Sequence, residues 1–284
     1  MSINIFQIVT DRIIEQLDKN IIAWRKSWQG GLPVNYVTQK AYQGINLLLL
    51  PHGGEWLTYR QAQEAGGSVK KGEKSSMIVF YKLMEKPKDN PDNPDEKEKF
   101  PLLRYSNVFH ISQCEGIESK QKPIELNNIS PIDNAEKALT DYISREKVNF
   151  RNVTGSNEAY YKPSSDTVIM PDIKQFDMSE EYYSTAFHEL AHSTGYKSRL
   201  NRLTETASFG SQTYSKEELI AEISACMVLN YLNVEIAETF ENSIAYINAW
   251  RKKLKEDNKL ILTASSQAQK ATNLILGLSQ DSQE

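Results

Sequence analysis

The sequence predicts an α+β protein of two domains, a small α+β first domain and a mainly helical second domain with a small sheet. Its 284 residues exceed one typical domain. Strand-like runs are prominent in the first part, whereas helical patterns dominate after about residue 179. A polar stretch with two prolines, 119–131, lies between these parts. We therefore expect domains over 1–125 and 130–284.

The elements of the first domain follow from periodicity and turn residues. Apolar residues at helical spacing, beginning at Ile5, predict an amphipathic helix. Thr58 and the Gly66–Gly67 pair are typical of a helix start and a helix stop. Three prolines and dense charge over 85–99 predict a solvated hairpin loop. The expected elements are helices over 2–19, about 42–50 and 58–66, and strands over 77–83 and 102–111.

The second domain shows fewer strand signals and longer helical patterns. Ser179 is a plausible N-cap, and Glu180 and Glu181 follow it where the helix dipole favours negative charge. Gly195 is a natural stop for that helix. The expected elements are helices over 132–146, 179–194, 215–231 and 236–256, short strands at 148–150, 159–161 and 167–170, and a last helix near 274–278.

Composition indicates a soluble intracellular protein. Apolar residues make up 39% and charged residues 25% of the chain. The longest apolar run, Ile45–Pro51, is too short to cross a bilayer, and the first residues lack a signal-peptide pattern. Two cysteines far apart in sequence, Cys114 and Cys226, favour a reducing compartment. We expect a cytoplasmic protein with no membrane partner.

Charge is unevenly distributed along the chain. Residues 1–86 hold 11 Lys and Arg against 7 Asp and Glu, an excess of 4 positive charges. The net charge of the whole is −4, so the remainder carries −8. A basic first part beside an acidic second part suggests two separate tasks.

The strongest chemical signal is His188-Glu-Leu-Ala-His192 on the predicted helix 179–194. Residues four apart project from one helix face, so both imidazoles can bind one divalent ion, for which zinc is the expected cofactor and manganese or cobalt the alternatives. Glu189 is rotated about 100° from His188 and can act as a catalytic base on a water. The motif also uses two of only four histidines in the protein.

A third ligand is expected from the next helix. Glu218 and Glu222 share a face there, so Glu218 can bind the metal while Glu222 accepts a ring N–H from a ligating histidine. Alternatively, Ser215 and Glu218 form a capping box, which leaves Glu222 as the ligand. We favour Glu218 and expect Glu217 to face solvent.

Stretches in both halves resemble a known family. The segments 160–171, 187–202 and 214–222 resemble the metallopeptidase-like domain of ArdC-type antirestriction proteins. The segments 22–28, 33–36, 42–46, 56–62 and 67–74 resemble the matching first domain, which also occurs in TraC-type plasmid primases. The resemblance implies a first domain that binds single-stranded DNA, and a zincin-like second domain. It also implies a protein of plasmids and other mobile elements that guards incoming DNA against host restriction after conjugation.

The residues of the first domain suit that expectation. Binding to single strands uses cations that follow phosphates and flat rings that stack on bases. Among the aromatic residues, Trp28 and Tyr42 have polar surroundings and nearby glycines, so they are the preferred stacking residues. The expected DNA-binding residues are Arg25, Lys26, Trp28, Tyr42, Arg60, Lys70, Lys71 and Lys74.

Three functional hypotheses remain open at this point. The first is an antirestriction protein that binds single-stranded DNA and carries a metallopeptidase-like zinc site. The second is an active zinc endopeptidase that cleaves a host protein, such as a restriction component, and uses DNA only for localisation. The third is an accessory DNA-processing or primase-associated protein.

Overall fold

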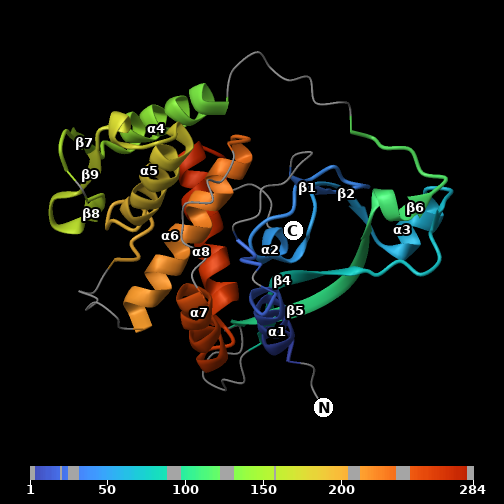
Figure 1. Cartoon of the computed structure of the whole chain (residues 1–284). Helices are drawn as coiled ribbons and strands as arrows, with labels where there is room; N and C mark the ends of the chain where they lie inside the picture. The colour runs from blue at the N-terminus through green and yellow to red at the C-terminus, as the bar shows by residue number, and fades with distance from the viewer. Residues whose placement is uncertain are drawn as a thin grey trace.

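The computed structural model describes residues 4–19, 21–24, 32–87, 97–121, 131–156, 158–203, 212–234 and 244–279 (Figure 1). It confirms the α+β class. None of the helices in these ranges combines the length and apolar character needed to cross a membrane.

The N-terminal region is a curved sheet flanked by short helices. Its sheet has the order β1-β2-β5-β4, in which β1 and β2 are parallel and the other pairs antiparallel. A two-stranded sheet, β3 with β6, lies beside α3. The elements are α1 (Ile5–Leu17), β1 (Pro33–Asn35), α2 (Ile45–Leu49), β2 (Gly54–Leu57), α3 (Tyr59–Glu64), β3 (Ser68–Val69), β4 (Ser76–Pro87), β5 (Lys97–His110), a 3-10 turn η1 (Ile111–Gln113) and β6 (Cys114–Glu115).

The C-terminal region is mainly helical and carries one small sheet of order β7-β9-β8. Helix α5 packs against β8 and β9 of this sheet, and α6 and α8 pack against α5 on the side away from the sheet (Figure 1). The elements are α4 (Pro131–Glu146), β7 (Asn149–Val153), β8 (Tyr160–Lys162), β9 (Thr167–Pro171), α5 (Ser179–Ser193), α6 (Gln212–Tyr231), α7 (Ile244–Glu256) and α8 (Leu260–Leu276), with 3-10 turns η2 (Pro163–Ser165) and η3 (Ile173–Gln175).

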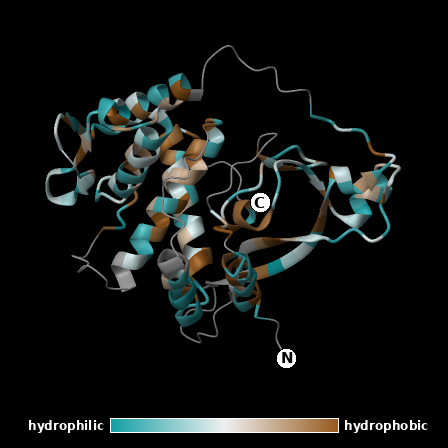
Figure 2. Cartoon of the chain, in the orientation of Figure 1, coloured by the Kyte–Doolittle hydropathy of each residue, from teal (hydrophilic) through white to brown (hydrophobic). Residues whose placement is uncertain are grey.

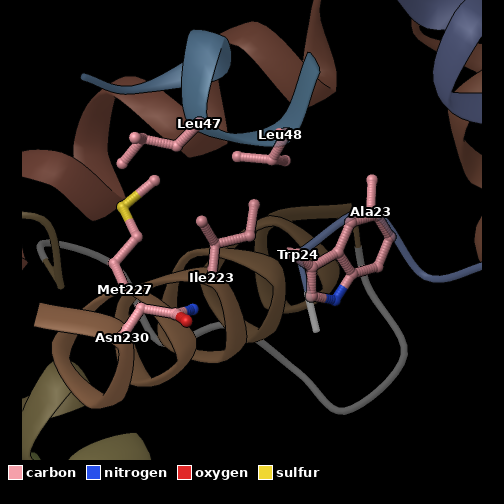
Figure 3. Close-up of a pocket in the computed structure, with 7 residues that line it drawn as sticks. All are labelled: Ala23, Trp24, Leu47, Leu48, Ile223, Met227 and Asn230. Carbon is pink, nitrogen blue, oxygen red and sulfur yellow. The ribbon is translucent and has the colours of Figure 1, made fainter. Parts of the chain in front are cut away.

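The two regions share a hydrophobic core. One cluster joins Ile13 of α1 and Leu47 of α2 to Ile223 of α6 and Ile261 of α8. Figure 3 shows part of this contact, where Leu47 and Leu48 lie over Ile223 and Met227 with Trp24 at the side. Figure 2 shows hydrophobic residues gathered on α2 and along α6 and α8. The C-terminal helices therefore complete the core of the N-terminal region, so the two regions are stabilised together.

The hairpin expected in the first domain is present. Strands β4 and β5 pair from Ser76 with Val108 as far as Pro87 with Lys97, so the pairing enters the segment expected to be loop. The expected loop residues 88–96 lie outside the described part of the chain.

Other expectations were wrong in detail. The last helix, α8, has 17 residues instead of a short segment at 274–278. Its many small and polar residues gave no clear apolar pattern, although the helix is largely buried. Strands β1 and β2 fall where a loop and the entry to a helix were expected. Ser179 is the first residue of α5 and not its cap, since the N-cap is Met178. Thr58, in contrast, caps α3 with a complete capping box.

Candidate metal centre

The site begins with the two histidines of α5. Buried residues of this helix, including Phe187, Leu190 and Ala191, pack in the C-terminal core and fix which face is turned outward. His188 and His192 lie on the remaining face, with side chains 16% and 13% exposed. Their Nε2 atoms are 3.2 Å apart and their rings are nearly perpendicular. The spacing of four residues therefore brings both imidazole nitrogens to one point.

Helix α6 supplies the third group. It is buried on two sides, because Ile220 and Ile223 face the shared core while Ala221 and Ala225 face the C-terminal core. This packing holds the Glu218 carboxylate against the histidines. Its Oε2 lies 3.6 Å from Nε2 of His188, and its Oε1 lies 3.7 Å from Nε2 of His192.

These three donors fit a divalent ion. One ligand atom from each of His188, His192 and Glu218 lies within 4.8 Å of the others, the only such group found in the described ranges. A tetrahedral ion with ligands at about 2.0–2.1 Å separates its donors by roughly 3.3–3.4 Å. The two Nε2 atoms are 3.2 Å apart, and each lies 3.6–3.7 Å from a different oxygen of the Glu218 carboxylate, slightly beyond that value. Two nitrogens and one oxygen leave a fourth position open, as catalytic zinc sites do.

The start of α6 bears on the two roles considered for Glu218. The helix begins at Gln212, so Ser215 lies inside it and cannot be its N-cap. The capping-box alternative is therefore wrong, and the Glu218 carboxylate is turned towards the histidines.

The second ring nitrogen of His192 has a partner that the sequence did not identify. Nδ1 of His192 lies 3.4 Å from Oε1 of Glu217, the residue expected to face solvent. Glu217 is only 14% exposed and forms an ion pair with Arg202, whose side chain is 7% exposed. Arg202 Nη2 also donates to the backbone oxygen of Ala191, in α5. The charged pair thus connects the segment after α5 to α6 and orients His192.

Glu222 does not take the role expected for it. Its Oε2 accepts a hydrogen bond of 3.1 Å from the indole N–H of Trp24, in the N-terminal region. Nδ1 of His188 is buried and has no hydrogen-bond partner among the described residues. One helical turn beyond Glu218, the Glu222 side chain is directed to the interface with the N-terminal region instead of to a histidine ring.

Negative charge surrounds the first histidine. Burial lowers the pKa of His188, but the nearby carboxylates, Glu218 foremost, raise it by more, so its pKa is raised overall. Glu189 contributes to this effect and is itself 9% exposed. It is not one of the three converging donors. A site with this potential attracts cations.

The segment after α5 is tightly built against the site. A Cβ at Gly195 would lie 2.9 Å from the side chain of Leu203 and 3.1 Å from the backbone oxygen of His192. Glycine is therefore required by close packing rather than by an unusual backbone angle. This close turn is what brings Arg202 back towards His192.

Comparisons with known proteins agree with this arrangement. A zincin-like metallopeptidase family model matches residues 137–267, and the model of the N-terminal domain of anti-restriction factor ArdC matches residues 3–109. The crystal structure of antirestriction ArdC protein from the R388 plasmid, in its metal-free form, has a TM-score of 0.74 at 34% identity and covers 98% of this chain and 100% of that one. The chain belongs to the ArdC antirestriction family.

Further relatives extend the family. The Mn(II)-bound structure of the R388 protein matches with a TM-score of 0.75, 34% identity and coverage of 99% of this chain and 100% of that chain. An uncharacterized protein, y4eC of Sinorhizobium fredii, is 31% identical over 99% of this chain and 94% of its own length. DNA primase TraC of Escherichia coli is 32% identical over 96% of this chain, which spans only 20% of that primase.

The family's N-terminal domain carries the residues expected to bind DNA. Arg25, Lys26 and Trp28 lie outside the described residues. Tyr42 is 8% exposed in the shared core, and burial raises the pKa of its hydroxyl. Its polar neighbours in sequence gave no sign of this packing. The preference for Tyr42 as a stacking residue is therefore corrected, because a buried ring offers no face to a base.

The expected cations are exposed. Arg60 is paired with Glu64 at 2.7 Å on the surface of α3. Lys70, Lys71 and Lys74 lie on the turn between β3 and β4, where Lys70 Nζ donates to the backbone oxygen of Ser112. Lys71 and Lys74 form no ion pair with the described carboxylates, so their charges are available to an anion.

Proposed function

We propose that this protein is an antirestriction protein that binds single-stranded DNA through its N-terminal region and one zinc ion through His188, His192 and Glu218. The observation that carries the proposal is the convergence of these three donors from α5 and α6. Membership of the ArdC family supports the antirestriction role. A Mn(II)-bound structure of the R388 protein supports a divalent metal and makes manganese the first alternative to zinc.

We assign a distinct task to each residue of the site. His188, His192 and Glu218 would hold the metal, and Glu217 with Arg202 would keep the His192 ring in its orientation. When bound, the ion supplies a Lewis acid that polarises a carbonyl group. Glu189, buried beside His188, would accept the proton of an attacking water.

This last task supports a second candidate, an active endopeptidase that cleaves a host protein such as a restriction component. Its support is the buried carboxylate of Glu189, which lies close enough to His188 to help raise the pKa of that imidazole. A primase-associated role has less support, because the chain corresponds to one fifth of TraC.

Metal content and DNA protection test these readings together. Purified full-length protein should contain close to one zinc per chain by elemental analysis, and His188→Ala should lose it. Glu189→Gln should retain the metal, since this residue is not a ligand. Glu180→Gln, in the first turn of the same helix, is the matched control. Absence of any stoichiometric divalent metal would overturn the proposal.

The restriction assay then separates the two candidates. Plasmid transfer into a restricting host measures protection of incoming DNA. Equal protection by wild type and Glu189→Gln would support the binding role and exclude the endopeptidase as the mechanism. Loss of protection in Glu189→Gln alone would favour the endopeptidase.

DNA binding is best tested on the whole chain. A fragment ending near residue 125 would lose Ile223, Trp250 and Ile261, which complete its core. We expect full-length protein to bind a labelled single strand with an affinity that falls steeply with salt and depends little on sequence. Affinity that does not respond to salt would count against this part of the proposal.

A further inference from the structure

A polar hollow of about 330 Å³ lies in the N-terminal region, away from the metal centre. Its walls come from the loop after α2, from β2, from the turn before β4 and from the end of β5 with η1. In Figure 1, α6 and α8 lie between α5 and β2. The residues that decide its chemistry are His52, Trp56, Glu73, Lys74, His110 and Ser112.

One wall of the hollow is rigid and electrically neutral. Nδ1 of His110 accepts from the Ser112 backbone N–H at 3.3 Å and lies 2.8 Å from the Ser112 hydroxyl. Burial and the neighbouring His52 keep the pKa of His110 below its usual value, so this ring is neutral near pH 7. Trp56 packs edge-on against it, with ring centroids 5.1 Å apart. His110, Ser112 and Trp56 therefore form this wall of the hollow.

The one carboxylate among the residues that line the hollow, Glu73, accepts a hydrogen bond from a neighbouring side chain. Gln113 Nε2 donates to Oε2 of Glu73 at 2.8 Å and to the backbone oxygen of Lys74 at 3.0 Å. The same side chain accepts from the His110 backbone N–H, so one glutamine ties both sides of the hollow together. The backbone that carries Lys74 is therefore held in place.

Two groups at the rim remain available. The Lys74 ammonium has no hydrogen-bond or ion-pair partner in the part of the chain that the structure describes. His52 is exposed, and its ring centroid lies 5.9 Å from that of His110. Lys74 and His52 both line the hollow, and a cation together with an exposed aromatic ring can bind a phosphate and a base.

Size and shape restrict the ligand. A volume of about 330 Å³ is at the lower end of the range for small-molecule sites and suits one nucleotide. A rigid duplex does not place a single unstacked base in such a hollow, whereas a single strand does.

We propose that this hollow is a one-nucleotide subsite for single-stranded DNA, in which Lys74 binds a phosphodiester and the His52 ring stacks on the adjacent base. The inference rests on the DNA binding proposed above and gives it a location. Exposed Lys71, on the same turn, would extend the positive path along the strand.

The test compares full-length variants by fluorescence anisotropy with a labelled oligodeoxythymidylate of about 20 nucleotides, long enough to cover a typical site. Lys74→Ala and His52→Ala should each weaken binding about 5- to 10-fold, and Lys74→Ala should reduce the salt slope by roughly 0.7. Lys19→Ala, an exposed lysine at the end of α1, is the control of equal charge change and should bind like wild type. Thermal unfolding checks that all variants are folded.

A second measurement separates a strand from a free nucleotide, which offers the same chemistry. Thymidine monophosphate should compete only at millimolar concentration, since it supplies one subsite. Tight binding of the mononucleotide with no effect of Lys74→Ala on the oligonucleotide would overturn the assignment to a strand. If wild type binds the strand and both variants match Lys19→Ala, this inference fails alone. If wild type does not bind at all, the proposed DNA binding fails with it.

Discussion

Charged side chains around α5 and α6 are buried and matched to partners, whereas those on the turn between β3 and β4 are exposed and only partly matched. At the metal centre, Glu217 is 14% exposed and paired with Arg202. On the turn, Lys71 and Lys74 are exposed and make no ion pair with the described carboxylates. A buried charge must be compensated, so the first group defines a single geometry. An exposed cation stays hydrated and can follow a polyanion that has no fixed position.

The largest expected effect tests which carboxylate belongs to the buried geometry. Glu218→Ala removes one of the three converging donors, so we expect metal affinity to fall more than the roughly 100-fold that loss of an outer partner can cause. Glu222→Gln should change it less than about 3-fold, because that residue binds Trp24. Metal titration of the apoprotein measures both. The reverse ranking would show that Glu222 is the ligand.

Buried polar groups of the same region should make the protein sensitive to alkali. Burial raises the pKa of Tyr142, beside Ser193, to about 12. The unfolded residue ionises near pH 10, so its contribution is complete below pH 10 and is lost as the pH rises to about 12. Relative to Tyr142→Phe, wild type should lose roughly 3 kcal/mol of unfolding free energy over this range. Parallel denaturation curves for the two proteins at both pH values would contradict this.

The pairing of Glu217 with His192 predicts a smaller effect on the metal. Glu217→Gln keeps an acceptor near Nδ1 but removes the charge, so metal affinity should fall about 10- to 100-fold. Arg202 also loses its partner, so the unfolding free energy of the apoprotein is measured in parallel. A loss of stability with unchanged metal affinity would assign the pair a purely structural role.

The smallest effect concerns the exposed turn. Lys71→Gln should reduce the salt slope of single-strand binding by roughly 0.7 and weaken binding a few-fold. Its unfolding free energy should change by less than about 0.5 kcal/mol, since the side chain is exposed. A large loss of stability would mean that this turn, like the metal centre, depends on its charges for folding.

Sequence patterns predicted much of the helical framework. Regular apolar spacing located α1 and α4 closely, and the N-cap of α3 was identified at Thr58. Helix α8 was largely missed, because small and polar residues such as Ala264, Ser265 and Thr272 are buried there by neighbours distant in sequence. A pattern limited to one segment carries no information about which neighbours will cover it.

The sequence by itself determined that His188 and His192 meet, because a spacing of four residues on one helix is sufficient. Only the tertiary structure decided which glutamate joins them. Glu217, Glu218 and Glu222 lie on adjacent turns of one helix, and the packing of α6 between two cores assigns one to His192 Nδ1, one to both Nε2 atoms and one to Trp24. The rotation of a helix about its axis is set by everything that packs against it.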